Sequence, residues 1–160
     1  MRIALLAIGR MKQGPERELV SRYLDRAVTA GKPLGLTGFD VAEQAESRAG
    51  SAAARKVDEA RAISSHLPPG GIVIALDERG KTLGSEDFAR RRASWRDDGK
   101  PAVSFVIGGA DGLDPAFAAG ADLTLSFSPL TWPHQLVRIM LAEQLYRATT
   151  ILSGHPYHRE

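Results

Sequence analysis

The chain has 160 residues, and its 21 Lys and Arg against 19 Asp and Glu give a formal net charge of +2 at pH 7. Hydrophobic residues make up 43% and charged residues 25%, the proportions of a globular protein, which excludes a disordered chain. Cysteine is absent, which excludes disulfides, thiolate metal sites and a cysteine nucleophile. We expect one domain over residues 1–160, in the cytoplasm, with no membrane-spanning segment.

The first half of the chain predicts two strands and one long helix. The apolar run 3–8 predicts a buried strand, and the run 36–41 predicts a second. Between them, residues 15–30 begin with proline and acidic residues and repeat apolar side chains at helical spacing. The polar stretch 42–50 is expected to be a flexible loop.

The second half continues the alternation of helices and apolar runs. Residues 51–66 and 85–95 predict helices, and residues 72–76, 103–107 and 123–127 predict strands. Helices that alternate with short apolar runs are typical of α/β proteins. The sequence therefore predicts an α/β fold with a mostly parallel sheet, flanked by helices and buried on both faces of each strand.

The last predicted helix, residues 134–152, has apolar side chains nearly all round. Such a helix must be covered on every side. Either it is the central helix of the domain, or one face packs against a partner subunit, and we expect a homodimer.

Positive charge is concentrated near the amino terminus. Residues 1–32 contain seven Lys and Arg against three Asp and Glu, so this segment carries +4 while the remainder of the chain is slightly acidic. The helix residues Arg22 and Arg26 belong to this surplus. The surplus fits either a solvated helix face or a surface that binds RNA.

Two loops in the second half have the composition of ligand-binding loops. Residues 108–113, GGADGL, follow the strand 103–107, and their glycines permit a tight turn and close approach of a ligand. Residues 128–133, SPLTWP, contain two prolines that make the segment stiff, so the remaining amides are expected to face a ligand such as an adenine ring. Neither loop has the G-x-G-x-x-G or P-loop pattern. A turn and a connector without ligands are the alternatives.

The carboxy terminus, residues 154–160, reads GHPYHRE. His155 and His158 have the spacing of metal ligands, but Pro156 breaks the helix that would align them and no third ligand type lies nearby, so no metal site is expected. The aromatic and cationic side chains suit an RNA base or phosphate better. A solvated tail is the alternative.

In this order, FVIGGADGL, LSFSPLTWPHQLVRIMLAEQLYRA and the terminal GHPYHRE closely resemble the ribosomal RNA large subunit methyltransferase H family, over the whole chain. These are SPOUT-class enzymes. The resemblance implies S-adenosyl-L-methionine as methyl donor and N3 of a pseudouridine in 23S rRNA, on the assembled ribosome, as acceptor. It also implies a carboxy-terminal trefoil knot, which the pattern of strands and helices does not reveal.

The resemblance also implies the site residues. The cofactor contacts fall on Leu76, Gly109, Ser128, Pro129, Leu130, Thr131, Trp132 and Pro133, and we add Gly108 because the turn requires it. The acceptor nitrogen must lose a proton, and the candidates for the base are His134, His155 and His158. We expect Tyr157 and Arg159 to bind the acceptor base or its phosphate, with Arg22, Arg26 and His155 as further RNA contacts.

Two other functions fit parts of the sequence. The first is a non-catalytic ribosome-binding factor with the same fold, which the intact loops 108–113 and 128–133 disfavour. The second is a small nucleotide-dependent hydrolase, which the absence of a P-loop and of a G-x-S-x-G motif disfavours.

Overall fold

A parallel β-sheet forms the centre of the molecule. The computed structural model describes residues 1–159 and places five strands in the order β2-β1-β4-β3-β5, with every neighbouring pair parallel. The strands are β1 (Arg2–Ile8), β2 (Gly38–Gln44), β3 (Ile72–Thr82), β4 (Ala102–Ile107) and β5 (Leu123–Ser126). Each predicted apolar run contributes to one of them, so the predicted α/β fold is confirmed.

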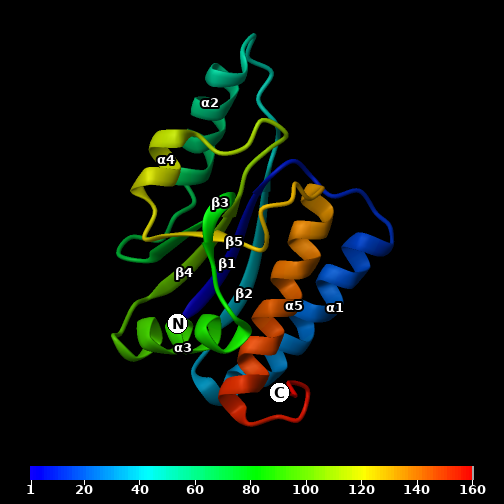
Figure 1. Ribbon diagram of the computed structural model, residues 1–160, viewed down its shortest axis with the longest axis vertical. Coiled ribbons are helices and arrows are strands. Elements are labelled where there is room, and N and C mark those ends of the chain that lie inside the picture. Colours follow the sequence, from blue (N-terminus) through cyan, green and yellow to red (C-terminus); the bar gives the residue numbers. More distant parts are fainter. Residues whose placement is uncertain (160) are drawn as a thin grey trace.

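Helices cover both faces of the sheet. They are α1 (Pro15–Gly31), the 3₁₀ turn η1 (Lys32–Leu34), α2 (Ala52–Ser64), α3 (Ser85–Asp97), α4 (Pro115–Gly120) and α5 (His134–Ser153). Figure 1 shows α1 and α5 side by side on one face and α2 and α4 on the other. Helix α3 packs against α5 and contributes to the core on the same side.

Alternate residues of each central strand enter two separate cores. In β1, Ile3 and Leu5 pack toward α1 and α5, whereas Ala4 and Leu6 pack toward α2. All six residues of β4 are buried. Strands covered on both faces have no polar alternation, which explains why these segments appear in the sequence as continuous apolar runs.

Strand β2 departs from the prediction. It lies at the edge of the sheet with β1 as its neighbour, and Val41 is 47% exposed, so the expectation that every strand is buried on both faces is wrong here. The expected loop over residues 42–50 is also wrong at its start, because β2 extends to Gln44. Helix α4 was not expected, since its six residues are too few to show a helical period.

Helix α5 is the central helix of its layer. Its residues Leu141, Ala142, Leu145 and Ala148 are fully buried against α1, α3 and the sheet. Its apolar character is therefore explained in large part within one chain. No helix within residues 1–159 is long and apolar enough to cross a membrane.

Strand β3 lies unusually close to its parallel neighbour β5 near Gly80. It continues six residues beyond its predicted end at Leu76, and its pairing with β5 shifts register between Leu76 and Lys81. A Cβ atom on Gly80 would lie 2.7 Å from backbone atoms of Thr124 and Leu125, so only glycine permits this approach. The trefoil knot implied by the family resemblance stays a prediction.

Replacing Gly80 with alanine is expected to force β3 and β5 apart. We expect Gly80→Ala to lower the free energy of unfolding by about 1–3 kcal/mol, the usual cost of overpacking a tight contact, measured by urea denaturation. Gly120→Ala is the control, because a Cβ there has no atom within 4 Å. Equal denaturation midpoints for the two variants would contradict the close approach.

Candidate functional site

A cavity of about 520 Å³ opens at the carboxyl edge of the sheet. Its walls come from residues 76–79 within β3 and from the segments that follow β4 and β5, together with the first turn of α5. The expected cofactor residues that line it are Leu76, Gly108, Gly109, Ser128, Leu130, Thr131 and Trp132. Pro129 and Pro133 lie between lining residues of the same loop. The carboxyl ends of parallel strands are the usual ligand-binding edge of an α/β sheet.

The glycine loop forms a tight turn on one side of the cavity. The amide of Gly112 donates a hydrogen bond to the carbonyl of Gly109 at 2.9 Å, and Gly112 has a φ of +83°. A Cβ on Gly108 would lie 2.8 Å from the backbone of Gly112, and one on Gly109 would lie 2.9 Å from Ile8. Glycine is therefore required at 108 by the backbone of the turn and at 109 by the side chains of Ile8 and Glu59.

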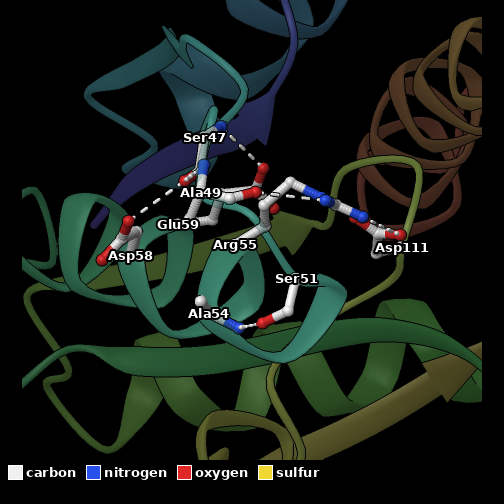
Figure 2. A network of polar contacts seen from close by, with 8 residues as sticks. All are labelled: Ser47, Ala49, Ser51, Ala54, Arg55, Asp58, Glu59 and Asp111. Atoms are coloured by element: carbon white, nitrogen blue, oxygen red, sulfur yellow. Dashed lines mark hydrogen bonds and ion pairs between the residues drawn. The ribbon is translucent and has the colours of Figure 1, made fainter.

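A forked ion pair fixes this turn to helix α2. Figure 2 shows Arg55 reaching from α2 to Asp111 at the tip of the turn. Its Nε donates to Asp111 Oδ2 at 2.6 Å, and a second guanidinium nitrogen donates to Oδ1 at 3.1 Å. The hydrogen bond from Arg55 lowers the pKa of the Asp111 carboxyl, so the pair is charged at neutral pH. The remaining guanidinium nitrogen donates to the carbonyl of Ala49 at 3.2 Å.

Glu59 lies beneath the same turn. Its side chain is buried and accepts a hydrogen bond from the amide of Ser47 at 3.0 Å (Figure 2). The Cβ position of Gly109 lies 3.0 Å from a carboxylate oxygen of Glu59. Arg55 and Glu59 thus connect the segment before α2 to the glycine turn of the cavity.

The proline-containing loop is held by its own side chains. The Ser128 hydroxyl accepts hydrogen bonds from the amide of Leu130 at 3.0 Å and from the indole nitrogen of Trp132 at 2.9 Å. Thr131 donates to the carboxylate of Glu78 at 3.1 Å. The stiffness predicted for this loop is thereby explained, but the expectation that its amides are free for a ligand is wrong for Leu130, whose amide binds Ser128.

Apolar and charged groups share the cavity wall. Leu130 is 64% and Trp132 39% exposed, although both are large and apolar. On the β3 side, Arg79 donates two hydrogen bonds to Asp77 at 3.0 Å, and this contact lowers the pKa of the Asp77 carboxyl. The cavity offers both apolar surface and charged groups, as expected for an amphiphilic ligand.

The expected catalytic residues fall into two groups. His134 begins α5 and lines the cavity. Tyr157, His158 and Arg159 follow the other end of α5, where Figure 1 places the carboxy terminus. A helix of 20 residues is about 30 Å long, so the last turn of α5 lies far from His134, and none of the tail residues 154–159 lines the cavity.

The tail is folded back on α5 in an ordered cluster. Tyr157 donates to the carboxylate of Glu143 at 3.0 Å, and Arg147 donates to the same oxygen at 2.6 Å while lying 4.9 Å from the Tyr157 ring. Burial, followed by the Glu143 contact, raises the pKa of the Tyr157 phenol, which keeps it protonated. His158 lies 3.3 Å from Arg147 and 3.9 Å from Glu86. The alternative of a solvated tail does not apply to Tyr157 and His158, which are partly buried.

The residues expected to contact RNA lie close to the same end of the molecule. Arg26 lies over the ring of Tyr146 at 6.0 Å, and the Tyr146 ring packs at a tilt against that of Tyr157, with 4.6 Å between the ring centroids. His155 accepts a hydrogen bond from the amide of Tyr157 at 3.2 Å. Arg22 is exposed one turn earlier on α1. The amino-terminal helix and the tail therefore form one surface.

Comparison with known proteins identifies the family. Residues 1–158 match the sequence profile described as "Predicted SPOUT methyltransferase". The chain belongs to the SPOUT methyltransferase family. It is 58% identical over 159 residues to the "Ribosomal RNA large subunit methyltransferase H" of Brucella anthropi and 55% identical to that of Rhodopseudomonas palustris, with 99% of each chain covered.

A solved structure shares the fold of this SPOUT methyltransferase. It is the crystal structure of a probable methyltransferase from Bordetella pertussis Tohama I, with a TM-score of 0.50 at 16% identity, covering 92% of this chain and 95% of that one. The resemblance inferred from the motifs is confirmed, and the protein is a methyltransferase. Within residues 1–159, no group of three or more His, Cys, Asp or Glu could hold a metal ion.

Several residues of this SPOUT methyltransferase site were not expected from the sequence. Asp77, Glu78 and Arg79 line the cavity, and their position directly after the predicted strand 72–76 could have revealed them. Arg55 gives no such signal, because it lies on α2, 56 residues before its partner Asp111.

The Arg55 contact is expected to order the glycine turn. In Arg55→Met, the amides of residues 109–112 should exchange hydrogen faster than in the wild type, because the turn loses its fixed contact with α2. Hydrogen exchange with mass spectrometry measures this. Arg61→Met on the same helix is the control, since exposed Arg61 only approaches Asp58 at 3.7 Å. Unchanged exchange in Arg55→Met would show that the turn is ordered without the ion pair.

Proposed function

We propose that this methyltransferase uses S-adenosylmethionine to methylate N3 of a pseudouridine in 23S rRNA on the assembled ribosome, in the cytoplasm. The cavity between β3 and the loops after β4 and β5 is the observation that carries the proposal, since it unites the residues that the family resemblance assigns to the cofactor. Relatives named ribosomal RNA large subunit methyltransferase H, covered over 99% of their length, support this substrate class.

The chemistry of the cavity fits this cofactor. Leu76, Leu130 and Trp132 offer apolar surface for an adenine ring, and Asp77 and Glu78 offer carboxylates for hydroxyl and ammonium groups. A cavity of about 520 Å³ is within the usual range for such ligands. When bound, S-adenosylmethionine supplies a methyl group already activated by its sulfonium. The protein then has to align the acceptor and exclude water.

The proton of the acceptor nitrogen needs a receiving group. His134 is placed for this role, because it lines the cavity at the start of α5. Tyr157 serves instead as a hydrogen-bond donor, since its phenol stays protonated. Arg159, next to it in the tail, supplies positive charge for the acceptor base or its phosphate.

A homodimer brings the two groups of residues together. Tyr157 of the tail bonds Glu143, nine residues after His134 and so about 14 Å along α5 from the start of the helix, and no residue of the described tail lines its own cavity, so we infer that the tail of a second copy reaches it. An apolar groove of about 400 Å³ borders the cavity and supports this arrangement. Leu19 of α1 and Ile139 and Met140 of α5 line it, and it shares Phe127 with the cavity. In the dimer, Arg22 and Arg26 of the second copy add positive charge near the bound RNA.

The substrate assignment can be tested in cells. Deleting the gene should remove one methyl group from a pseudouridine of 23S rRNA, as measured by mass spectrometry of rRNA digests, and the wild-type gene should restore it. A Gly109→Trp gene is the control for catalysis, because the bulky side chain fills the turn at the cavity. If that variant restored the methyl group, or if deletion removed none, the proposed activity would be wrong.

Variants of the tail test whether its residues bind the RNA acceptor and not the cofactor. His158→Ala and Arg159→Ala should lower kcat/KM for ribosome methylation by about tenfold or more, since they remove groups that contact the acceptor. The Kd for S-adenosylmethionine, measured by calorimetry, should stay unchanged because the proposed cofactor contacts lie in the cavity wall and none lies in the tail. His66→Ala and Arg61→Ala, both exposed and outside the site, are the matched controls. An equal loss of cofactor affinity would assign the tail to cofactor binding instead.

A further inference from the structure

The segment Gly9–Gly14, which we call the β1 loop, lies beside the cavity. It leaves β1 directly after Ile8, and the Cβ position of Gly109 is 2.9 Å from the Ile8 side chain. β1 and β4 are neighbours in the sheet, with Ala7 paired to Ile107. The β1 loop and the glycine turn of the cavity therefore emerge next to each other at the same edge.

Buried charged groups hold the backbone of the β1 loop. Arg138 of α5, only 3% exposed, donates hydrogen bonds to the carbonyls of Ile8 at 2.9 Å and Gly9 at 2.6 Å. The amide of Met11 donates to Glu43 of β2 at 3.0 Å, and the Met11 side chain is buried. The loop is thus fixed to β2 and α5, although it has no regular secondary structure.

Arg17 completes this support from α1. Its guanidinium donates to the carbonyl of Met11 at 2.6 Å and lies 3.7 Å from the carboxylate of Glu43. Glu43 also pairs with Arg138 at 2.6 Å. The one carboxylate that holds the β1 loop is therefore already neutralised by two arginines.

The two cations of the β1 loop point away from this support. Arg10 and Lys12 flank buried Met11 and are both exposed. Within residues 1–159, neither forms an ion pair with a carboxylate. A fixed backbone thus presents two available positive charges beside the cavity, which reduces the entropy lost when they bind an anion.

We propose that Arg10 and Lys12 bind the phosphate backbone of the RNA strand whose nucleotide enters the adjacent cavity. This inference rests on the proposed function. Phosphate contacts position a nucleic acid without reading its sequence, and cations on a fixed loop suit that role. The surface is separate from Arg22 and Arg26, which lie farther along α1 toward the tail.

Salt dependence of ribosome binding tests the assignment. The logarithm of the association constant falls linearly with the logarithm of the salt concentration, and each cation that contacts the phosphates of a single strand adds about 0.7 to the steepness of this fall. The double variant Arg10→Gln with Lys12→Gln should therefore make the slope shallower by about 1.4. Arg91→Gln with Lys100→Gln removes the same charge from exposed positions on α3 and just before β4, remote from the cavity. This control should leave the slope unchanged, and both double variants should keep the wild-type Kd for S-adenosylmethionine.

Photocrosslinking identifies the class of partner. The chain has no cysteine, so Lys12→Cys can be labelled at one position with a benzophenone and irradiated on the ribosome. Crosslinks to 23S rRNA are expected, with Arg91→Cys as the labelled control that gives none. Crosslinks to ribosomal proteins alone would overturn the inference and assign the β1 loop to a protein contact.

The outcomes separate this inference from the proposed function. A wild type that methylates ribosomes, together with equal salt slopes in the two double variants, overturns the role of Arg10 and Lys12 alone. A wild type that binds no ribosomal RNA overturns both. A reduced slope for the β1 loop variant only, with RNA crosslinks from position 12, supports the inference.

Discussion

All five strands run in the same direction, and every part of the candidate site depends on this constraint. Residues 76–79 of β3 and the segments that follow β1, β4 and β5 lie at one edge of the sheet, so they meet although they are separated by up to about 120 residues of chain. The cavity is built from three of these segments, and the fourth lies beside it. Since the strands are covered on both faces, the carboxyl edge is where ligands gain access to the backbone.

Arg138 extends this constraint to the helical layer. Its guanidinium connects α5 to the end of β1 and to Glu43 of β2, although its side chain is almost fully buried. Burial lowers the pKa of Arg138, while Glu43 favours its charged form. Removing either partner would leave a buried charge without compensation, so the start of α5, with His134, is held in register with the sheet.

The sequence was sufficient for the order of the five strands and the four longer helices, and insufficient where the result depends on distant neighbours. The glycines at 108 and 109 and the prolines at 129 and 133 are local signals, and the loops they predicted line the cavity or belong to its wall. Arg55 and Arg138 carry no local signal, because their partners lie on other elements. The exposure of Val41 likewise follows from the edge position of β2, which the composition of one strand cannot reveal.

The length of α5 sets the distance between the two groups of functional residues. Each residue of a helix adds 1.5 Å and about 100° of rotation. Inserting or deleting one residue between His134 and Ser153 would therefore turn Glu143, Arg147 and the tail away from their present neighbours. The helix therefore fixes a distance, and its tolerance for insertions is much lower than that of an exposed loop such as residues 98–101. The position of the tail relative to the cavity therefore depends on the length of α5 as much as on the identity of its side chains.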